Sequence, residues 1–323
     1  MSEATQFDII EQIGQDLEQV EVSLAASFET GAEDFNALIR PLSAAGGKRL
    51  RAQLCILVAL AGNSVQEERI KIAESVEMLH LATLIHDDVL DQAAIRRGES
   101  TIHTHKGNKI AILSGDYLFA KCFALVASLN STEYLKVFTH IITCLVEGEF
   151  MQMEDVYRID QGIDRYMTKT QKKTADFMEG CMELGGRLGG WSPEHIVQLK
   201  RYGHALGMAF QITDDIMDYR ESSDTTGKPS GNDLKEGLLT YPLLSIVTDD
   251  NKDKLLADIK NLANGGDDQA IIDYVIAQGG VDNTLVVADK YCNDAYDALN
   301  QLPDFDGKVL LEMAVANLAD RKV

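Results

Sequence analysis

The residues with the clearest chemical potential are aspartates in the pattern Asp-Asp-x-x-Asp, which occurs three times in the chain. In a helix this spacing places the first and last carboxylates one turn apart on one face, with the second beside them. Like charges this close repel one another, so the pattern does not stabilise a fold by itself. A hard divalent cation relieves the repulsion, and Mg²⁺ binds a few carboxylates while keeping positions for water and phosphate oxygens. The pattern therefore indicates Mg²⁺ binding.

Sequence context distinguishes the three copies. Two of them end apolar stretches, HLATLIHDDVLD and GMAFQITDDIMD, and burying a helix that runs into carboxylates is costly unless a cation is bound. We interpret these two as metal sites: the first motif is Asp87, Asp88 and Asp91, and the second motif is Asp214, Asp215 and Asp218. The third copy, in TDDNKDK, follows an apolar run and is typical of an exposed helix start; it comprises Asp249, Asp250 and Asp253.

Basic residues accompany both motifs in a chain whose net charge is −21. So acidic a chain argues against nucleic-acid binding and against a basic membrane-surface patch, since both need positive charge spread over a face. Basic side chains near metal-binding carboxylates instead suit a diphosphate, which Arg binds by paired hydrogen bonds and Lys as a point charge. They are Lys48, Arg49, Arg51, Arg96, Arg97, Lys172, Lys173, Lys228 and Lys235. His80, two helical turns before the first motif, is by itself more typical of a packed histidine.

Helices must position these residues, and the chain contains few residues that interrupt helices. Its 323 residues include only five prolines, which favours a helix-rich protein. Helical periodicity covers 5–40, 66–91, 110–129, 133–157, 163–190 and 195–221. Loops are predicted at 92–108 and 222–236, followed by four or five helices to Val323. Strand alternation does not persist anywhere and no long linker divides the chain, so we expect a single all-α domain over residues 1–323.

The N-terminal sequence and the cysteines bear on the compartment. The start, MSEATQFDII, has neither a basic segment nor an apolar signal core. The longest wholly apolar run, 55–61, is far shorter than the ~20 residues that a membrane span needs. The five cysteines are odd in number, widely separated and mostly flanked by apolar residues, as reduced core cysteines are. We expect a cytoplasmic protein without a transmembrane segment.

Taken together, these segments resemble the trans-isoprenyl diphosphate synthase family, also called polyprenyl synthetases. The resemblance runs from Gly46 to about Pro242 and covers most of the chain. It rests on GGKRLR (46–51), LIHDDVLDQAAIRRG (84–98), GDYLFA (115–120), EGEFMQ (147–152), KKTA (172–175), FQITDDIMD (210–218) and GKPSGNDLKEG (227–237). It implies an all-α bundle around a central cavity, usually a homodimer, that joins isopentenyl diphosphate to an allylic diphosphate such as farnesyl or geranyl diphosphate.

The resemblance also implies a role for each matching residue. The diphosphate of isopentenyl diphosphate would be held by Lys48, Arg51, His80 and Arg97. The Mg²⁺ ions that bridge the allylic diphosphate would be bound by Asp87, Asp88, Asp91 and Asp214. Assisting residues would be Arg96, Lys173 and Lys228, with Asp215 and Asp218 orienting the second site. Thr174 and Gln211 would lie beside the reacting carbons.

The implied reaction begins when metal ions and basic side chains stabilise the departing diphosphate, so that the allylic C–O bond ionises. The double bond of isopentenyl diphosphate then attacks the carbocation, and a proton is lost. A dry apolar cavity is required because water would quench the cation.

Two features bear on product length. Short-chain members of the family carry bulky aromatic residues four or five positions before the first motif, where this chain has Thr83 and Ala82. These small residues imply a product of C30 or more, in the heptaprenyl to octaprenyl range. In addition, Leu238 stands where many members have a lysine that contacts diphosphate. Leu238 thus resembles long-chain members, including catalytic subunits of two-component heptaprenyl synthases.

Other functions remain open at this stage. The chain could be a catalytic subunit that is active only in a heterodimer with a small noncatalytic partner, or a shorter-chain geranylgeranyl synthase. A class I terpene cyclase would leave GGKRLR, His80 and Arg97 without a second diphosphate to hold. A noncatalytic regulatory subunit would have lost aspartates that are intact here.

Overall fold

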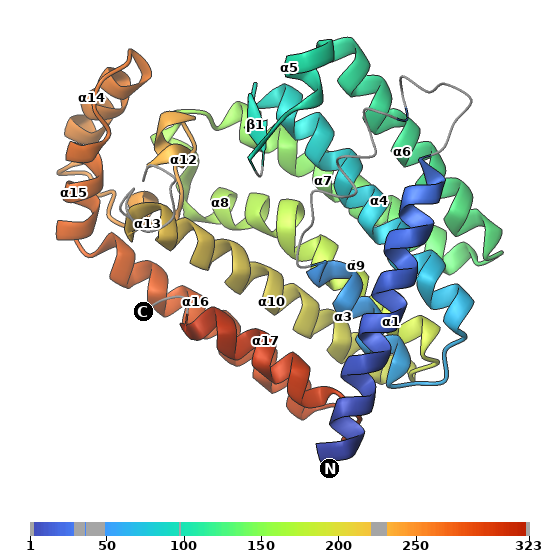
Figure 1. The fold of residues 1–323 in the computed structure, drawn as a ribbon. Helices are drawn as coiled ribbons and strands as arrows, with labels where there is room; N and C mark the ends of the chain where they lie inside the picture. The colour runs from blue at the N-terminus through green and yellow to red at the C-terminus, as the bar shows by residue number, and fades with distance from the viewer. Residues whose placement is uncertain (1–2, 29–35, 37–48, 97, 221–230, 321–323) are drawn as a thin grey trace. The chain divides into compact units, whose positions relative to one another are not determined.

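The structure, a computed structural model, describes residues 3–28, 36, 49–96, 98–220 and 231–320. Almost all of its regular structure is helical, which confirms the predicted all-α class (Figure 1). The chain divides into two compact units. The first unit comprises Met1–Thr139, Cys181–Val197 and Asp304–Val309; the second comprises His140–Gly180, Gln198–Pro303 and Leu310–Val323. The single domain predicted over residues 1–323 stays a prediction.

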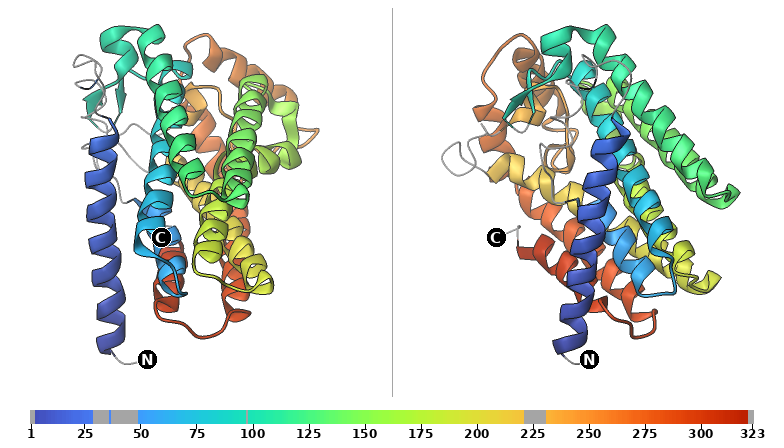
Figure 2. Two further views of the ribbon diagram at one scale, coloured as in Figure 1. Left: turned by 90° about the vertical axis from the view of Figure 1, so that its right-hand side faces the viewer. Right: turned by 45° about the vertical axis from the view of Figure 1, so that its right-hand side comes forward.

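The first unit is built around α4, the helix that ends in the first motif. Its elements are α1 (Glu3–Ser27), α3 (Leu50–Leu60), α4 (Gln66–Leu90), β1 (Ile95–Arg96), β2 (Glu99–Ser100), α5 (Ile102–Lys106) and α6 (Asn108–Ser128), with the first turns of α7 (Thr132–Glu154). Helix α4 packs most extensively along α6 and also contacts α1 and α3 (Figure 2). It forms because apolar residues recur at helical spacing, and Ile72, Val76, Leu79 and Ile85 are all buried.

A glycine in the GDYLFA segment permits the close packing of α4 on α6. A Cβ atom at Gly115 would lie 2.2 Å from Nε2 of His86, a contact that real Cβ atoms do not make. The His86 ring also packs against Phe119 one turn further along α6, with 5.5 Å between the ring centroids. A side chain at position 115 would therefore displace His86, which immediately precedes the first motif.

The segment predicted as a polar loop at 92–108 contains two short strands and the short helix α5. Strands β1 and β2 form a short antiparallel hairpin in which Ile95 pairs with Ser100 and Arg96 with Glu99. Gly98 has φ of +83°, a conformation that glycine adopts at little cost and that a tight hairpin turn requires. The two-residue strands are too short to show an alternating pattern in the sequence. This hairpin returns the chain toward the end of α4.

Helix α6 is the one described helix that is long and apolar enough, by length and composition alone, to cross a membrane. Its 21 residues include an 18-residue window of mean hydropathy 1.7, and 33% of that window is buried within the structure. The buried positions include Ala111, Leu118 and Cys122, whereas Ile112 and Leu113 are exposed. This helix contains no long wholly apolar run, because isolated polar residues such as Asp116 interrupt it.

The second unit carries the second motif at the end of α10. Besides the rest of α7 it contains η1 (Ile159–Gln161), α8 (Gly162–Thr170), the π-helix η2 (Gln171–Ala175), α12 (Asn232–Lys235), α13 (Tyr241–Leu244), α14 (Lys252–Ala263), α15 (Gln269–Ala277) and α16 (Gly280–Asn300). Three further helices contribute residues to both units: α9 (Asp176–Leu188), α10 (Pro193–Arg220) and α17 (Lys308–Asp320). Ile212 and Ile216 of α10 pack in a core with Leu234, Leu243 and Val275.

Comparison with the predicted elements shows one notable difference in this unit. The predicted helix at 163–190 is divided into α8, η2 and α9, and π-helical turns of this kind frequently accompany functional sites. Downstream of the second predicted loop, α13 to α17 supply the four or five helices expected. The third aspartate copy lies at a helix start as predicted, with Asp253 in the first turn of α14. All five cysteines are buried and free of disulfides.

Candidate active site

The first motif lies at the C-terminal end of α4, where the helix dipole disfavours negative charge. Asp88 is buried, Asp87 is half-buried and Asp91, the C-terminal cap, is exposed. The β1–β2 hairpin brings Arg96 back to this end, and its Nε lies 2.5 Å from Oδ1 of Asp88. One of the three carboxylates, that of Asp88, is therefore paired with an arginine of the chain.

Two residues assigned to isopentenyl diphosphate lie together in the first unit. Nη1 of Arg51, at the start of α3, lies 3.3 Å from Nε2 of His80 on α4. The neighbouring Arg49 serves a different purpose, because its guanidinium binds Glu21 at 2.6 Å and Glu77 at 3.0 Å. The other two predicted residues, Lys48 and Arg97, lie outside the described residues.

The two positions predicted to set product length differ in exposure. Ala82 is fully buried, whereas Thr83 is half-buried and its hydroxyl donates to the carbonyl oxygen of His80 at 2.8 Å. A larger side chain at position 83 therefore displaces fewer neighbouring atoms than one at position 82. This difference decides which variant best tests the prediction.

A chain of hydrogen bonds connects the predicted residues of the second unit. The Thr174 hydroxyl, in η2, donates to Oε1 of Gln211 at 3.0 Å, and Nε2 of Gln211 donates to Oδ1 of Asp215 at 3.0 Å. The hydroxyl of Tyr166, on α8, donates to the other oxygen of Asp215. Asp215 is thus buried with both carboxylate oxygens bonded, while Asp214 beside it is exposed. Sequence reasoning missed Tyr166, whose contact with Asp215 spans 49 residues.

The last aspartate of the second motif holds the start of α12, a short helix that lies within the second predicted loop. Asp218 accepts hydrogen bonds from the backbone N–H groups of Asn232 at 3.1 Å and Asp233 at 3.2 Å. Asp233 thereby joins the carboxylates of the motif. Its segment, GNDLKEG, carries part of the family resemblance, but the sequence pattern alone indicates no role for Asp233. Lys228, which precedes Asp233 in the same segment GKPSGNDLKEG, lies outside the described residues.

Burial is the main cause of the raised carboxyl pKa values of Asp215 and Asp233. It raises the pKa of Asp215 to about 7, and the nearby charges of Asp214 and Asp218 add to the effect. Burial raises the pKa of Asp233 to about 8, again with contributions from Asp215 and Asp218. Such a concentration of acid is the environment in which a divalent cation binds favourably, because it replaces mutual repulsion with attraction.

The lysines of the KKTA segment pair with the EGEFMQ segment of α7. Nζ of Lys173 lies 2.5 Å from Oε2 of Glu149, and Nζ of Lys172 lies 2.5 Å from Oε2 of Glu147. The residue between the two glutamates is Gly148, where a Cβ would lie 2.7 Å from Cγ of Lys173. Lys173 is therefore positioned by α7.

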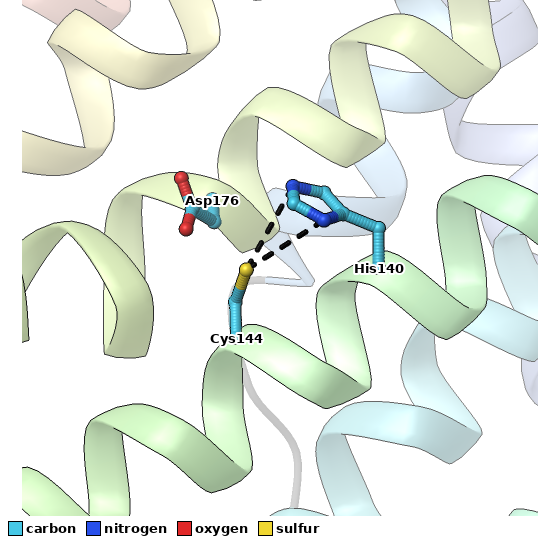
Figure 3. Close-up of side chains that lie close together, drawn as sticks. All are labelled: His140, Cys144 and Asp176. Atoms are coloured by element: carbon cyan, nitrogen blue, oxygen red, sulfur yellow. Dashed lines mark hydrogen bonds between the residues drawn. The ribbon is translucent and has the colours of Figure 1, made fainter.

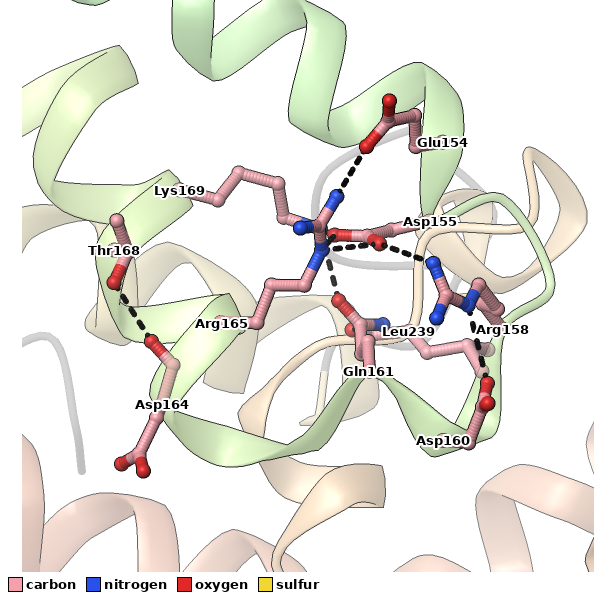
Figure 4. Close-up of polar contacts among 10 residues, drawn as sticks. All are labelled: Glu154, Asp155, Arg158, Asp160, Gln161, Asp164, Arg165, Thr168, Lys169 and Leu239. Carbon is pink, nitrogen blue, oxygen red and sulfur yellow. Dashed lines mark hydrogen bonds and ion pairs between the residues drawn. The ribbon is translucent and has the colours of Figure 1, made fainter.

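A buried charge network supports the helix that carries Tyr166 (Figure 4). Asp155, whose side chain is inaccessible to solvent, binds Nε of Arg165 at 2.7 Å and lies 3.8 Å from Nζ of Lys169. Nζ of Lys169 also donates to Gln161, whose amide in turn donates to the carbonyl oxygen of Leu239. Removing one member of such a network leaves an uncompensated buried charge. The network therefore fixes α8 against the end of α7.

We expect the stability of the metal-free chain to fall as pH rises through neutrality. Asp215 and Asp233 have folded-state pKa values of about 7 and about 8, against an ordinary value of 3.8. The folded chain binds these protons more tightly than the unfolded chain, so their contribution is fully present below about pH 4 and is lost as pH rises to about 8. In chelator, Asp233→Asn should flatten the fall in Tm between about pH 5 and about pH 8.5, because the amide does not ionise.

The matched control for this experiment is Asp253→Asn, at an exposed position in the first turn of α14. It should retain the pH dependence of the unmodified chain. If the Tm of the Asp233→Asn variant falls with pH as steeply as that of the unmodified chain, the assignment of this pH dependence to Asp233 is contradicted. Thermal unfolding followed by circular dichroism at several pH values provides the measurement.

Comparisons with known proteins give a consistent result. A family model described as polyprenyl synthetase matches residues 32–278. The chain is 33% identical over 300 residues to heptaprenyl diphosphate synthase component 2 of Geobacillus stearothermophilus, covering 93% of each chain. The structure matches a polyprenyl synthase from Caulobacter crescentus, complexed with calcium and isoprenyl diphosphate, with a TM-score of 0.89, 29% identity and 98% coverage of each chain. It also matches a geranylgeranyl pyrophosphate synthase from Lactobacillus brevis, with a TM-score of 0.87 and 29% identity. This match covers 96% of the present chain and 97% of the Lactobacillus chain.

Proposed function

The chain belongs to the polyprenyl synthetase family and is a prenyltransferase, and we propose on that premise that it makes a long-chain trans-polyprenyl diphosphate of C30 or more. The substrates of the family are isopentenyl diphosphate and an allylic diphosphate. The observation that carries the long-chain proposal is the pair of small residues, Ala82 and Thr83, on the helix that ends in the first motif. The named heptaprenyl relative supports the same choice.

We assign the metal role to Mg²⁺ on the chemistry of the donors. Both motifs offer carboxylate oxygens, which suit a hard cation, and in the second motif burial of the acids favours a cation. Asp87, Asp88, Asp91 and Asp214 would hold the ions, which supply stabilisation of the leaving diphosphate. Of these four residues, Asp91 and Asp214 are exposed to solvent.

The remaining site residues position and stabilise the reactants under this proposal. Arg51 and His80 bind the diphosphate of isopentenyl diphosphate, while Arg96, Lys173 and Lys228 assist the allylic diphosphate. Buried Asp215 orients Gln211 through the hydrogen bond between them, and Asp218 holds the backbone of 232–233. The oxygen atoms of Thr174 and Gln211 place their dipoles near the developing allylic cation.

Lys173 and Arg96 must each exchange a carboxylate for a diphosphate. In this structure they contact Glu149 and Asp88, both at 2.5 Å. Pairing with a carboxylate before substrate arrives keeps each basic group oriented, and a more highly charged diphosphate can then compete for it.

We propose a homodimer as the working assembly. Exposed apolar side chains on α6, Ile112 and Leu113, offer surface for a second copy to cover. A heterodimer with a small noncatalytic subunit is the alternative, supported by the relative whose name is component 2 of a heptaprenyl synthase. A geranylgeranyl synthase is the second alternative, supported by the structural similarity to such an enzyme. Cytoplasmic localisation belongs to the same proposal.

One experiment tests the proposal against these alternatives. The purified chain, sized by gel filtration, is incubated without added protein with Mg²⁺, farnesyl diphosphate and radiolabelled isopentenyl diphosphate. We expect a dimer whose dephosphorylated products chromatograph at C30 or longer. Products that stop at C20 would identify a geranylgeranyl synthase, and activity only on adding a small subunit would identify the heterodimer. Either result overturns the proposal as stated.

A further inference from the structure

A cluster of mixed metal ligands lies in the second unit, apart from the residues of both aspartate motifs. His140 and Cys144 lie four residues apart on α7, so they share one face of the helix, and Asp176 is the first residue of α9 (Figure 3). Each of the three offers one ligand atom, and these atoms lie within 4.8 Å of one another. Cys144 and Asp176 are buried, whereas His140 is exposed.

The sulfur–nitrogen distances in this cluster are close to those between ligands of one tetrahedral ion. Sγ of Cys144 lies 3.7 Å from both ring nitrogens of His140. A tetrahedral ion with bonds of about 2.3 Å to sulfur and about 2.0 Å to nitrogen separates those two ligand atoms by about 3.5 Å. Either tautomer of the histidine can therefore present a nitrogen to the ion, and the ligand oxygen of Asp176 lies within 4.8 Å of the other two ligand atoms.

The donor types select the class of ion. A thiolate, an imidazole and a carboxylate together suit Zn²⁺ and similar borderline divalent ions, whereas Mg²⁺ prefers oxygen ligands alone. Three protein ligands leave a fourth position for water. The exposed His140 gives the ion a route from solvent to the buried sulfur.

We propose that His140, Cys144 and Asp176 form a second metal site of this protein, which binds one Zn²⁺-class divalent ion through sulfur, nitrogen and oxygen. The ion ties α7 to the start of α9. Asp176 directly follows the π-helix that carries Lys173 and Thr174, so the ion would also fix the end of that segment. The site is independent of the proposed reaction and would exist whatever the product of the enzyme.

The Cys144 thiol must lose its proton to bind the ion, and its surroundings in the metal-free chain oppose this loss. Burial, and then the neighbouring Asp176 carboxylate, raise the pKa of the Cys144 thiol to about 12. A thiol with so high a pKa is protonated at neutral pH in the absence of metal. Ion binding must therefore release a proton from the sulfur, and affinity must rise with pH.

A neighbouring group of ligands shares Asp176 and provides a competing location. Asp176, Glu179 and His204 also offer ligand atoms within 4.8 Å of one another. Glu179, however, is already engaged by Nζ of Lys200 at 3.3 Å, and this group contains no sulfur. We therefore assign the ion to the group that contains Cys144.

Cobalt substitution distinguishes the two locations without reference to enzyme activity. The full metal-free chain is titrated with Co²⁺ in excess Mg²⁺, which occupies oxygen-only sites, and the absorption spectrum is followed. We expect a near-ultraviolet sulfur-to-cobalt charge-transfer band that saturates at one ion per chain and is displaced by Zn²⁺. Cys144→Ser should lose the band. His140→Ala, at an exposed position that tolerates substitution, should keep sulfur ligation but weaken Co²⁺ binding at least about tenfold.

Matched variants control for folding and for location. Cys292→Ser changes another buried cysteine and should keep the band, and His204→Ala removes the histidine of the competing group and should also keep it. Cobalt spectra without a charge-transfer band, or a band that survives in Cys144→Ser, would overturn the proposal. If Cys144→Ser does not fold, unchanged Co²⁺ affinity in His140→Ala would overturn it equally.

Discussion

Asp87→Ala and Asp214→Ala are each expected to lower turnover by about 10²- to 10³-fold, the loss typical when one preorganised electrostatic contact to a transition state is removed. Each substitution takes away a carboxylate proposed to hold Mg²⁺ beside the departing diphosphate. Neither removes a buried group, because Asp87 is half-buried and Asp214 is exposed. The fold should therefore remain intact, and circular dichroism and Tm should be close to those of the unmodified chain. Initial rates at saturating Mg²⁺ provide the measurement.

The choice of residues makes this prediction decisive. Asp88→Ala would be ambiguous, since it also leaves Arg96 without the carboxylate that it contacts at 2.5 Å. Asp250→Ala is the matched control, because it alters an Asp-Asp-x-x-Asp copy at an exposed position before α14 and should leave turnover unchanged. Rates near those of the unmodified chain in either Asp87→Ala or Asp214→Ala would refute the metal assignment.

The helices that end in aspartates could be predicted because the sequence patterns that indicate them involve residues close together in the chain. Apolar residues at helical spacing define α4 and α10, and both motifs are contiguous in the sequence. The β1–β2 hairpin has too few residues to show a pattern, and it depends on the positive φ of Gly98. The π-helix at Gln171–Ala175 has only five residues, of which Ala175 alone is apolar, so sequence periodicity cannot distinguish it from an α-helix.

Contacts between distant residues account for what the sequence could not show of the site. Tyr166 and Asp215 meet because α8 folds back on α10, and no sequence spacing encodes that contact. Asp233 joins the second motif only because the backbone of its own segment is bound by Asp218. Likewise, the basic run GGKRLR did not reveal that Arg49 is committed to Glu21 and Glu77 while Arg51 reaches His80. Lys48, Arg97 and Lys228 remain sequence predictions, because they lie outside the described residues.

Product length is the second large effect that we expect, and the variants at positions 82 and 83 test it. The first motif lies at the C-terminal end of α4, so earlier residues of the helix lie further from the proposed diphosphate site, where a growing tail must extend. A phenyl ring there should stop elongation early and shift the products from C30 or longer to C15 or C20, while the first condensations stay fast. Ala82→Phe introduces the ring at a fully buried position and overpacks it, at a cost in stability of about 1–3 kcal/mol.

Thr83→Phe is the sharper test, because position 83 is half-buried and a ring there displaces fewer neighbours. Thr83→Val is its matched control: it removes the hydroxyl that donates to the His80 carbonyl at 2.8 Å but adds no bulk, so product length should not change. Chromatography of dephosphorylated products from the three variants and the unmodified chain, with Tm as the check on folding, compares them directly. A folded Thr83→Phe variant that still makes the long product would show that the tail extends elsewhere. A C15 product from the unmodified chain would refute the long-chain proposal itself, because the small residues at 82 and 83 would then leave room that the enzyme does not use.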